Sequence, residues 1–306
     1  MNTLLLGGNG FIGSHLVDKL VAEGHKVRVF DKYEEHYRKP IAECDYCYGD
    51  FGNRGLLADA LNDIDIVFHL VSTTLPETSN DDPAFDVQSN VVETLFLLEQ
   101  CVAKKTQKVV FISSGGTVYG KPVELPVNED SPTDPKCSYG ITKLIIEKYL
   151  ALFKFLHGLN YVIVRPSNPY GDRQNPNSIQ GAIPVFLGKV ARGEAVEIWG
   201  DGEVVRDYIF IDDLVEGIYR AATVNAQSCI FNLGSGVGRS LNDIIETMRG
   251  ITGRQVKVVY KAKRAFDIPK MYLDISRAEQ ELSWAPVTSL ESGMEKTWKF
   301  IQKLYS

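Results

Sequence analysis

The chain of 306 residues is long enough for one large or two modest domains, and its 44% apolar and 24% charged residues are ordinary for a globular protein. A net charge of −6 and the lack of any Lys or Arg run argue against nucleic acid as a partner. No stretch approaches the roughly 20 apolar residues that cross a bilayer, so we expect a cytoplasmic protein without a membrane partner.

Short apolar runs alternate with helix-like spacing along the first half of the chain. We predict strands at 2–6, 26–30, 65–70, 108–113 and 161–165 and helices at 11–23, 53–62, 86–104 and 138–157. The strands are almost continuously apolar, which is typical of strands that are buried on both faces. The pattern therefore predicts an α/β fold with a Rossmann-type doubly wound parallel sheet.

The texture changes near residue 166, where RPSNPYGDRQNPN is rich in Pro, Asn and Gly. We expect a dinucleotide-binding domain at 1–165 and a smaller substrate-binding domain at 166–306. A strand at 228–233, within the stretch 207–235, is expected to return to the main sheet, so the two domains should be partly interleaved.

Gly7, Gly10 and Gly13 lie between the first predicted strand and the first helix. In a dinucleotide site the first glycine permits a tight turn, the second lets the backbone approach a pyrophosphate, and the third lets the helix pack on the strand. A glycine triplet alone also fits a plain loop, so the motif needs support from other residues.

Asp31 ends the second predicted strand, 18 positions beyond Gly13. A carboxylate there can accept hydrogen bonds from both ribose hydroxyls and would repel a 2′-phosphate, which predicts NAD rather than NADP. The neighbouring Lys32 argues the other way. Asp50 and Phe51 of YGDF could grip an adenine, although a turn role suits Asp50 equally well.

Five cysteines, an odd number, predict free thiols. Cys44 and Cys47 have the spacing of half a zinc site, but no second pair accompanies them, so we expect no metal.

Tyr139 and Lys143 are four residues apart in SYGITK and share one face of a predicted helix. An ammonium about 4 Å from a phenolate supplies about 4 kcal/mol at an effective dielectric near 20. That is roughly what moves a phenol pKa from 10 to 7. On a bare surface helix the pair would have no function, but with the glycine turn and Asp31 it predicts an acid/base centre.

The motifs GGNGFIGSHL, HLVS, SSGGTVYG, SYGITK, RPSNPYG, GDGEVVRDYIFIDDL, FNLGSG and RAFDIPKMYLD follow one another along nearly the whole chain. In this order they resemble the nucleotide-sugar epimerases of the extended short-chain dehydrogenase/reductases, the family of UDP-glucose 4-epimerase. The resemblance implies an NAD-dependent enzyme that inverts C4 of a UDP-hexose through a 4-keto sugar. It also implies a homodimer through helices near 86–104 and 138–157.

The same resemblance implies roles for single residues. Tyr139 would take the proton of the sugar 4-hydroxyl, and Lys143 would hold the nicotinamide ribose. The further residues expected beside the cofactor are Phe11, Ile12, Leu70 and Asn90. The residues expected to hold the nucleoside diphosphate are Asn168, Arg206, Arg264 and Asp267. Met271 would lie beside the sugar ring, where a bulky side chain favours an unacetylated hexose.

The turn SSGGTVYG departs from the family pattern, in which a Ser or Thr precedes the tyrosine of VYG by four residues. Gly115 stands there, so we expect Ser114 to assist proton transfer, with Thr117 as the alternative. Related dehydratases and decarboxylases carry acids where Gly116 and Thr117 stand, which argues against their chemistry.

Two other functions stay open. A 4-ketosugar reductase or dehydrogenase would use Tyr139 and Lys143 but release its dinucleotide after each turnover. A dinucleotide-sensing scaffold without catalysis is less favoured, because it would not need those two residues together.

Overall fold

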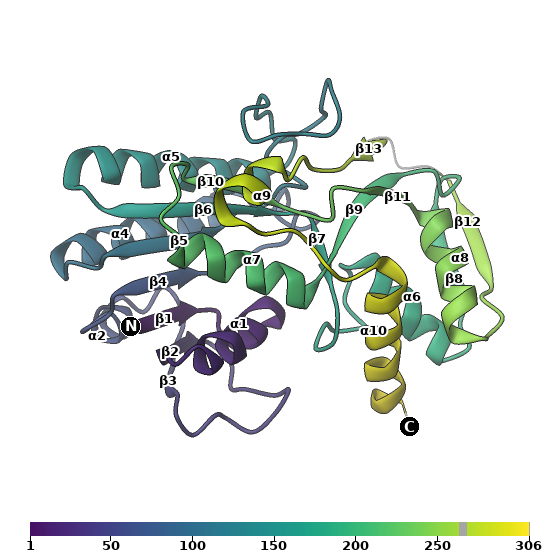
Figure 1. Ribbon diagram of the computed structural model, residues 1–306, viewed down its shortest axis with the longest axis horizontal. Coiled ribbons are helices and arrows are strands. Elements are labelled where there is room, and N and C mark those ends of the chain that lie inside the picture. Colours follow the sequence, from purple (N-terminus) through teal and green to yellow (C-terminus); the bar gives the residue numbers. More distant parts are fainter. Residues whose placement is uncertain (263–267, 306) are drawn as a thin grey trace.

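A parallel sheet of seven strands forms the centre of the computed structural model, which describes residues 1–262 and 268–305 (Figure 1). In spatial order the strands are β10 (Ile230–Leu233), β6 (Asn160–Pro166), β5 (Lys108–Ile112), β4 (Ile66–His69), β1 (Asn2–Leu6), β2 (Lys26–Asp31) and β3 (Asp45–Tyr48). The strand order reverses at β1, which has β2 on one side and β4 on the other. Such a reversal opens a crevice at the carboxyl ends of the strands, where ligands of this architecture bind. The predicted Rossmann-type fold is confirmed.

Helices cover both faces of this sheet. The covering helices are α1 (Phe11–Ala22) and α7 (Ile211–Thr223) on one face, and α2 (Arg54–Ala60), α4 (Glu93–Ala103) and α5 (Ser138–His157) on the other. Leu5 packs in the core on the α1 side, whereas Leu4 and Leu6 pack in the core on the α5 side. Because alternate residues of one strand are apolar on both faces, the sequence shows continuous apolar runs.

Two local features differ from the predicted elements. The helix expected at 86–104 is divided into α3 (Pro83–Asp86), a π-helical turn η1 (Val87–Val92) and α4. The edge strand β3 was not predicted, because its sequence DYCY is short, is only half-buried and has no continuous apolar run.

A smaller part of the molecule lies beyond the carboxyl end of the sheet, at the right of Figure 1. Its strands are β7 (Asn168–Tyr170), β9 (Val205–Phe210), β11 (Gly238–Ser240) and β13 (Lys270–Met271) in one sheet, and β8 (Val196–Trp199) and β12 (Val258–Lys261) in another. Its helices are α6 (Ala182–Ala191), α8 (Leu241–Thr252) and α10 (Leu290–Leu304). The chain returns to the large sheet with α7, β10 and α9 (Ser276–Leu282), so the two parts alternate along the sequence.

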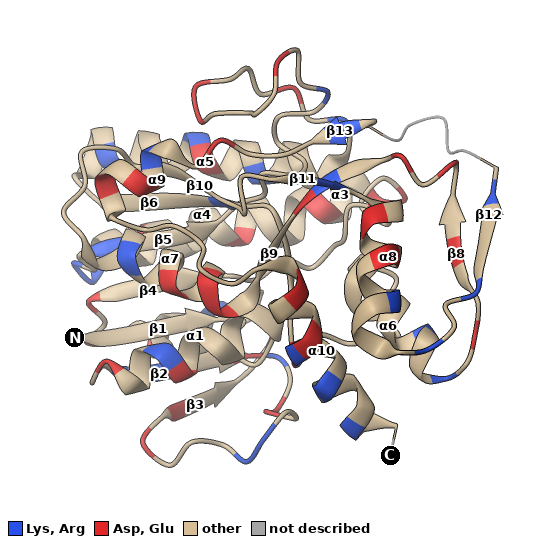
Figure 2. Ribbon diagram, turned by 45° about the vertical axis from the view of Figure 1, so that its right-hand side comes forward, with Lys and Arg blue, Asp and Glu red and all other residues tan. Residues whose placement is uncertain are grey.

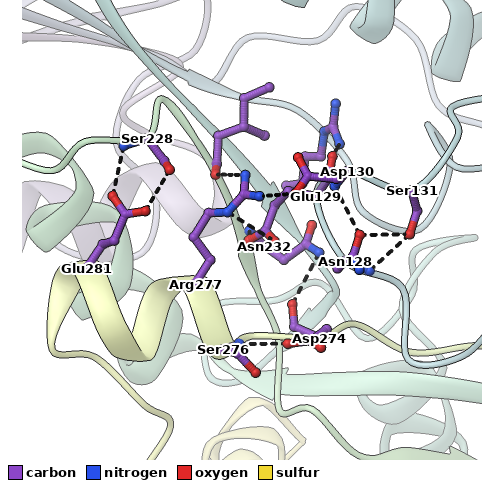
Figure 3. A network of polar contacts seen from close by, with 12 residues as sticks. Asn128, Glu129, Asp130, Ser131, Ser228, Asn232, Asp274, Ser276, Arg277 and Glu281 are labelled. Carbon is purple, nitrogen blue, oxygen red and sulfur yellow. Dashed lines mark hydrogen bonds and ion pairs between the residues drawn. The ribbon is translucent and has the colours of Figure 1, made fainter.

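Polar contacts join α9 and the loop before α5 to the segment that carries the edge strand β10 (Figure 3). Arg277 of α9 donates to Asp130 Oδ2 at 2.5 Å, and Glu129 Oε1 accepts from the backbone N of Asn232 at 2.8 Å. Glu281 accepts from the backbone N and the hydroxyl of Ser228. The edge of the large sheet is thereby covered by side chains rather than left open.

Candidate functional site

The glycine turn joins β1 to α1 in a conformation that only small residues allow. Gly7 has φ of 84°, and a Cβ on Gly13 would lie 2.2 Å from the carbonyl oxygen of Gly7. A Cβ on Gly10 would meet only that same oxygen, at 3.4 Å, so protein packing does not demand a glycine there. Close approach of a ligand to the backbone would demand it.

The first turn of α1 begins at this glycine turn with Phe11 and Ile12. No side chain caps its amino end at Gly10, so the N–H groups of the first turn remain available. Together with the helix dipole they suit the pyrophosphate of a dinucleotide.

Asp31 ends β2 beside the glycine turn. Its Oδ2 accepts from the backbone N of Asn9 at 2.9 Å and its Oδ1 accepts from the backbone N of Tyr33 at 3.0 Å. The two bonds fix the carboxylate, and each oxygen keeps a lone pair for a ribose hydroxyl. These residues fit NAD.

Asp50 lies beyond β3 and near Lys32, whose Nζ is 3.2 Å from Asp50 Oδ2. The hydrogen bond from the backbone N of Gly52, and after it Lys32, lower the pKa of Asp50. Lys32 is thus paired with a carboxylate, but both side chains are exposed and such a pair is weak.

Phe51 and Leu70 follow β3 and β4 at the same end of the sheet. Phe51 is buried, with its ring centroid 5.2 Å from that of His69, and Leu70 is half-buried. Burial, and after it the Lys143 charge, lowers the pKa of His69 to about 3, so the imidazole is neutral at pH 7. Phe51 and the neutral His69 ring therefore form an apolar contact at this end of the sheet.

Asn90 lies in the π-helical turn and is bonded on both sides of its amide. Its Oδ1 accepts from the backbone N of Thr73 at 3.0 Å, and its Nδ2 donates to Asp86 Oδ1 at 2.9 Å. The fully buried Asp86 also accepts from the hydroxyls of Thr74 and Ser138, each at 2.6 Å. Asp86, which sequence reasoning missed, thus joins Asn90 to the first turn of α5.

Tyr139 and Lys143 lie on α5, with the Lys143 ammonium 5.5 Å from the centroid of the Tyr139 ring. The ammonium donates to the carbonyl oxygen of Ile112 at the end of β5, at 3.0 Å. Burial lowers the pKa of Lys143 to about 8, against the opposing charges of Asp86 and Glu147. The expected pair is therefore present.

The pKa of Tyr139 is shifted in the opposite direction to the one expected from the sequence. Burial, and after it Cys137 and Asp86, raise the pKa of Tyr139, whereas the sequence led us to expect a lowered value. The physical reason is that burial desolvates the phenolate, while Lys143, with a pKa of about 8, has already lost its charge in the pH range where the phenol would ionise.

The turn after β5 brings Ser114 and Thr117 close to α5. The backbone N of Thr117 donates to the carbonyl oxygen of Ser114, and Gly140 of α5 packs on Thr117. A Cβ on Gly115 would lie 2.7 Å from Leu273 Cδ1 and 3.1 Å from the carbonyl oxygen of Arg165. A side chain at position 115 would therefore require its neighbours to shift.

The two candidate hydroxyls differ in accessibility. Thr117 Oγ1 is closed off from solvent without a hydrogen-bond partner among the described residues. Ser114 is half-buried and its hydroxyl makes no hydrogen bond within the described chain. Of the two, Ser114 is the hydroxyl that a substrate could reach.

A cavity of ≈ 640 Å³ lies in the smaller part of the molecule. Asn168 and Arg206 line it, as do Lys189, Trp199 and Tyr208, which sequence reasoning missed. Asn168 Nδ2 donates to the carbonyl oxygen of Asp207 at 2.8 Å, and Arg206 Nη1 to that of Ile268 at 2.7 Å. No local pattern singles out the missed residues, because the consecutive residues Glu197, Ile198 and Trp199 of β8 line the cavity rather than alternate ones.

Of the remaining predicted substrate residues, the structure describes Met271. Met271 is buried in β13, where it pairs in register with Arg206 and packs with Val118 and Leu273. Arg264 and Asp267 lie outside the described residues.

Other ligand classes leave fewer traces. Within residues 1–262 and 268–305, no group of three or more potential ligands gathers that could hold a metal ion. No helix of that part of the chain is long and apolar enough to cross a membrane. Figure 2 shows basic and acidic residues interspersed along the helices.

Comparison with known proteins gives matches over nearly the whole chain. The model of the NAD-dependent epimerase/dehydratase family matches residues 3–234. A UDP-glucose 4-epimerase of Mycolicibacterium smegmatis is 34% identical over 99% of both chains. A dTDP-4-dehydro-6-deoxyglucose reductase of Escherichia coli is 32% identical over 98% of this chain and 97% of its own.

Solved structures match equally well. The UDP-glucose 4-epimerase of Thermotoga maritima with UDP-glucose has a TM-score of 0.95 and 35% identity over 100% of both chains. The UDP-glucose 4-epimerase of Thermus thermophilus in complex with NAD has a TM-score of 0.91 and 28% identity over 99% of each chain. The similarity thus includes both the glycine turn and the cavity of the smaller part.

Proposed function

This chain belongs to the NAD-dependent epimerase/dehydratase family, and we propose that its substrates within that family are UDP-glucose and UDP-galactose. It is an NAD-dependent nucleotide-sugar 4-epimerase. The observation that carries the proposal is the Tyr139 and Lys143 pair at the end of β5, with the glycine turn on one side of the fold and the Asn168 and Arg206 cavity on the other.

The proposed roles follow from the chemistry of each side chain. Tyr139 takes the O4 proton and later returns it, while Lys143 stabilises the phenolate and the hydroxyl of Ser114 assists the transfer. When bound, NAD supplies the acceptor, and afterwards the donor, of the hydride at C4. The residues proposed to hold that cofactor are Gly7, Gly10, Phe11, Ile12, Gly13, Asp31, Asp50, Phe51, Leu70 and Asn90.

The nucleotide must stay in place while the sugar turns to present its other face. We propose that Asn168, Arg206, Arg264 and Asp267 hold the nucleoside diphosphate, because a guanidinium pairs two phosphate oxygens at once. Met271, buried beside Arg206, narrows the space for the sugar and favours an unacetylated hexose.

Incubation with UDP-glucose, UDP-N-acetylglucosamine and UDP-glucuronate, without added cofactor, tests this function. We expect proton NMR to show UDP-galactose as the product of UDP-glucose, and little change in the other two. A 4-ketosugar reductase, which is the second candidate because of the Escherichia coli relative, would leave all three sugars unchanged and would instead consume NADPH stoichiometrically with a nucleotide-bound 4-keto sugar.

We also propose a cytoplasmic homodimer. All five cysteines are free thiols, which suits a reducing compartment. Helix α5 exposes apolar side chains along one face, and a second copy of the chain would cover them. Those exposed side chains are Ile141, Leu152, Phe155 and Leu156.

A further inference from the structure

A cluster of charged side chains on the flank of α1 joins three segments of the chain. Asp18 Oδ2 lies 2.5 Å from Arg38 Nη1 and 2.8 Å from Arg173 Nη2. Arg38 belongs to the segment 32–44 between β2 and β3, and Arg173 to the segment 171–181 between β7 and α6. We propose that these three residues, the Asp18 clasp, are positioning residues that hold the bound dinucleotide in the protein.

The first arm of the clasp fixes the segment that begins at the adenosine side of the cofactor crevice. Asn9 of the glycine turn donates from its backbone N to Asp31 and from its Nδ2 to the carbonyl oxygen of Tyr33 at 2.7 Å. Farther along, Arg38 Nη2 donates to the carbonyl oxygen of Ser14 at 3.1 Å. The segment is therefore tied down at both Tyr33 and Arg38, so a dinucleotide held by Asp31 leaves more easily once the Arg38 contacts open.

The second arm comes from the smaller part of the molecule. Arg173 has φ of 62°, a left-handed conformation that is unusual for a residue other than glycine. Its neighbour Asp172 lies 3.5 Å from His15 Nε2, so two consecutive residues contact α1. Strain of this kind persists where the surrounding contacts fix the residue, and it is frequent at ligand clamps.

Two buried donors beside the clasp lack acceptors. Arg38 Nε and Arg173 Nη1 have no hydrogen-bond partner within residues 1–262 and 268–305. A buried N–H without an acceptor is unfavourable, so an oxygen-rich ligand beside α1 would stabilise both groups. The other titratable groups around the clasp are His15, Asp172 and Glu35, and Glu35 lies 3.7 Å from Arg38 Nη2.

Retention of the cofactor is the direct measurement. The variants Asp18→Asn, Arg38→Ala and Arg173→Ala are purified with their NAD and washed repeatedly in nucleotide-free buffer, and the NAD that remains is quantified by chromatography. We expect Asp18→Asn and Arg38→Ala to shorten the half-time of NAD loss at least about tenfold, since such changes act mostly on dissociation rates. Activity is not the readout, because the segment 171–181 also lines the nucleotide cavity.

Arg28→Ala is the matched control. Arg28 also joins its strand to a neighbouring segment through an aspartate, Asp45 at 2.7 Å, but it lies toward the amino end of β2, away from Asp31. The half-time of NAD loss from Arg28→Ala should stay within about twofold of that of the wild type. Thermal unfolding of all variants without cofactor separates loss of the clasp from loss of the fold.

The double variant Arg38→Ala/Arg173→Ala tests whether the two arginines act through one carboxylate. If they do, its effect equals that of Asp18→Asn and is smaller than the product of the single effects. If the effects of the two single variants on the half-time of NAD loss multiply in the double variant, the two arginines act independently and do not share Asp18. Half-times of Asp18→Asn and Arg38→Ala within about twofold of the wild type would overturn the proposal. The inference needs only the NAD cofactor of the family and not the proposed hexose.

Discussion

Gly115 carries no hydroxyl, and a Cβ there would crowd Leu273 and two backbone carbonyl oxygens, so the hydroxyl that assists proton transfer must come from another position. Ser114 is then the accessible hydroxyl, since Thr117 Oγ1 is closed off from solvent. We expect Ser114→Ala to lower kcat by about tenfold or more, with little change in substrate binding, and Thr117→Val to be mild. Steady-state kinetics of both variants checks this. If Thr117→Val lowers kcat strongly and Ser114→Ala leaves it nearly normal, Thr117 is the residue that assists proton transfer.

Tyr139 is the proton carrier in the proposed reaction. Tyr139→Phe should lower turnover by roughly 10²- to 10⁴-fold, the range typical of a lost general acid or base. The bound NAD content should stay close to that of the wild type, because the aromatic ring and the Lys143 contact to Ile112 remain. Initial rates and cofactor content are measured on the same preparation. Activity within a few-fold of the wild type would show that another group carries the proton.

Lys143 makes the folded protein less stable at neutral pH. Its pKa is about 8 in the fold against an ordinary 10.5, so below pH 8 both folded and unfolded chains carry the charge, and only the folded chain buries it. As pH rises from 8 to 10.5 the folded state loses the proton first, and this destabilisation fades. The buried ammonium is thus kept for chemistry at the expense of stability.

We therefore expect the stability of Lys143→Met, relative to wild type, to depend on pH. Between pH 7 and pH 10 its advantage in the free energy of unfolding should decrease by about 2 to 3 kcal/mol, one pKa unit being worth about 1.4 kcal/mol. Urea unfolding of the cofactor-free proteins at both pH values measures this. A difference that does not change with pH would mean that Lys143 keeps its ordinary pKa.

Helix α5 and strand β6 are joined behind the catalytic turn by a buried ion pair. Arg165 donates to Glu147 through Nε at 3.0 Å and Nη2 at 2.5 Å, and its Nη1 donates to the hydroxyl of Tyr119 at 2.9 Å. Ser113 Oγ donates to the same carboxylate at 2.5 Å. The pair therefore fixes the turn that carries Ser114 relative to the helix that carries Tyr139.

Removing one charge of the Glu147–Arg165 pair should lower the stability of the folded protein. Glu147→Gln leaves the Arg165 charge buried without its counter-ion, and we expect it to lower the free energy of unfolding by about 3 to 5 kcal/mol. Glu246→Gln, which removes an exposed partner of Arg249, is the control and should change it by about 0.5 kcal/mol or less. Urea denaturation compares the two. Equal, small effects would mean that water reaches Arg165.

The elements that sequence predicts well are those with a local pattern. The glycine turn and the Tyr139 and Lys143 pair each lie within a few residues, so their spacing was readable. Asp86 and the Glu147–Arg165 pair act through partners that are distant along the chain, and only the folded sheet brings them together. Trp199, which lines the cavity, was missed because the sequence of a short edge strand does not show what its side chains face.

At the scale of the whole molecule, both faces of the large sheet are covered, yet α5 leaves an apolar face exposed. Phe155 is 85% exposed and Leu156 57%, and Ile141 and Leu152 lie along the same side of the helix. Helix α4 packs beside α5 and carries the half-buried Phe96. Apolar side chains gathered in this way on a helix pair are typical of an interface, and a two-fold axis would let each copy cover the other.

Phe155→Glu should therefore separate the proposed homodimer. A charge at the most exposed position of this face would be buried without a partner in the dimer, whereas in a monomer it stays in water. We expect the wild type to sediment at twice the 34.1 kDa chain mass and Phe155→Glu at the single mass. Val287→Glu, at an 88% exposed position between α9 and α10, is the control and should leave the dimer intact. A wild type that sediments as a monomer at micromolar concentration would contradict the proposed assembly, and unequal behaviour of the two variants would locate the interface on α5.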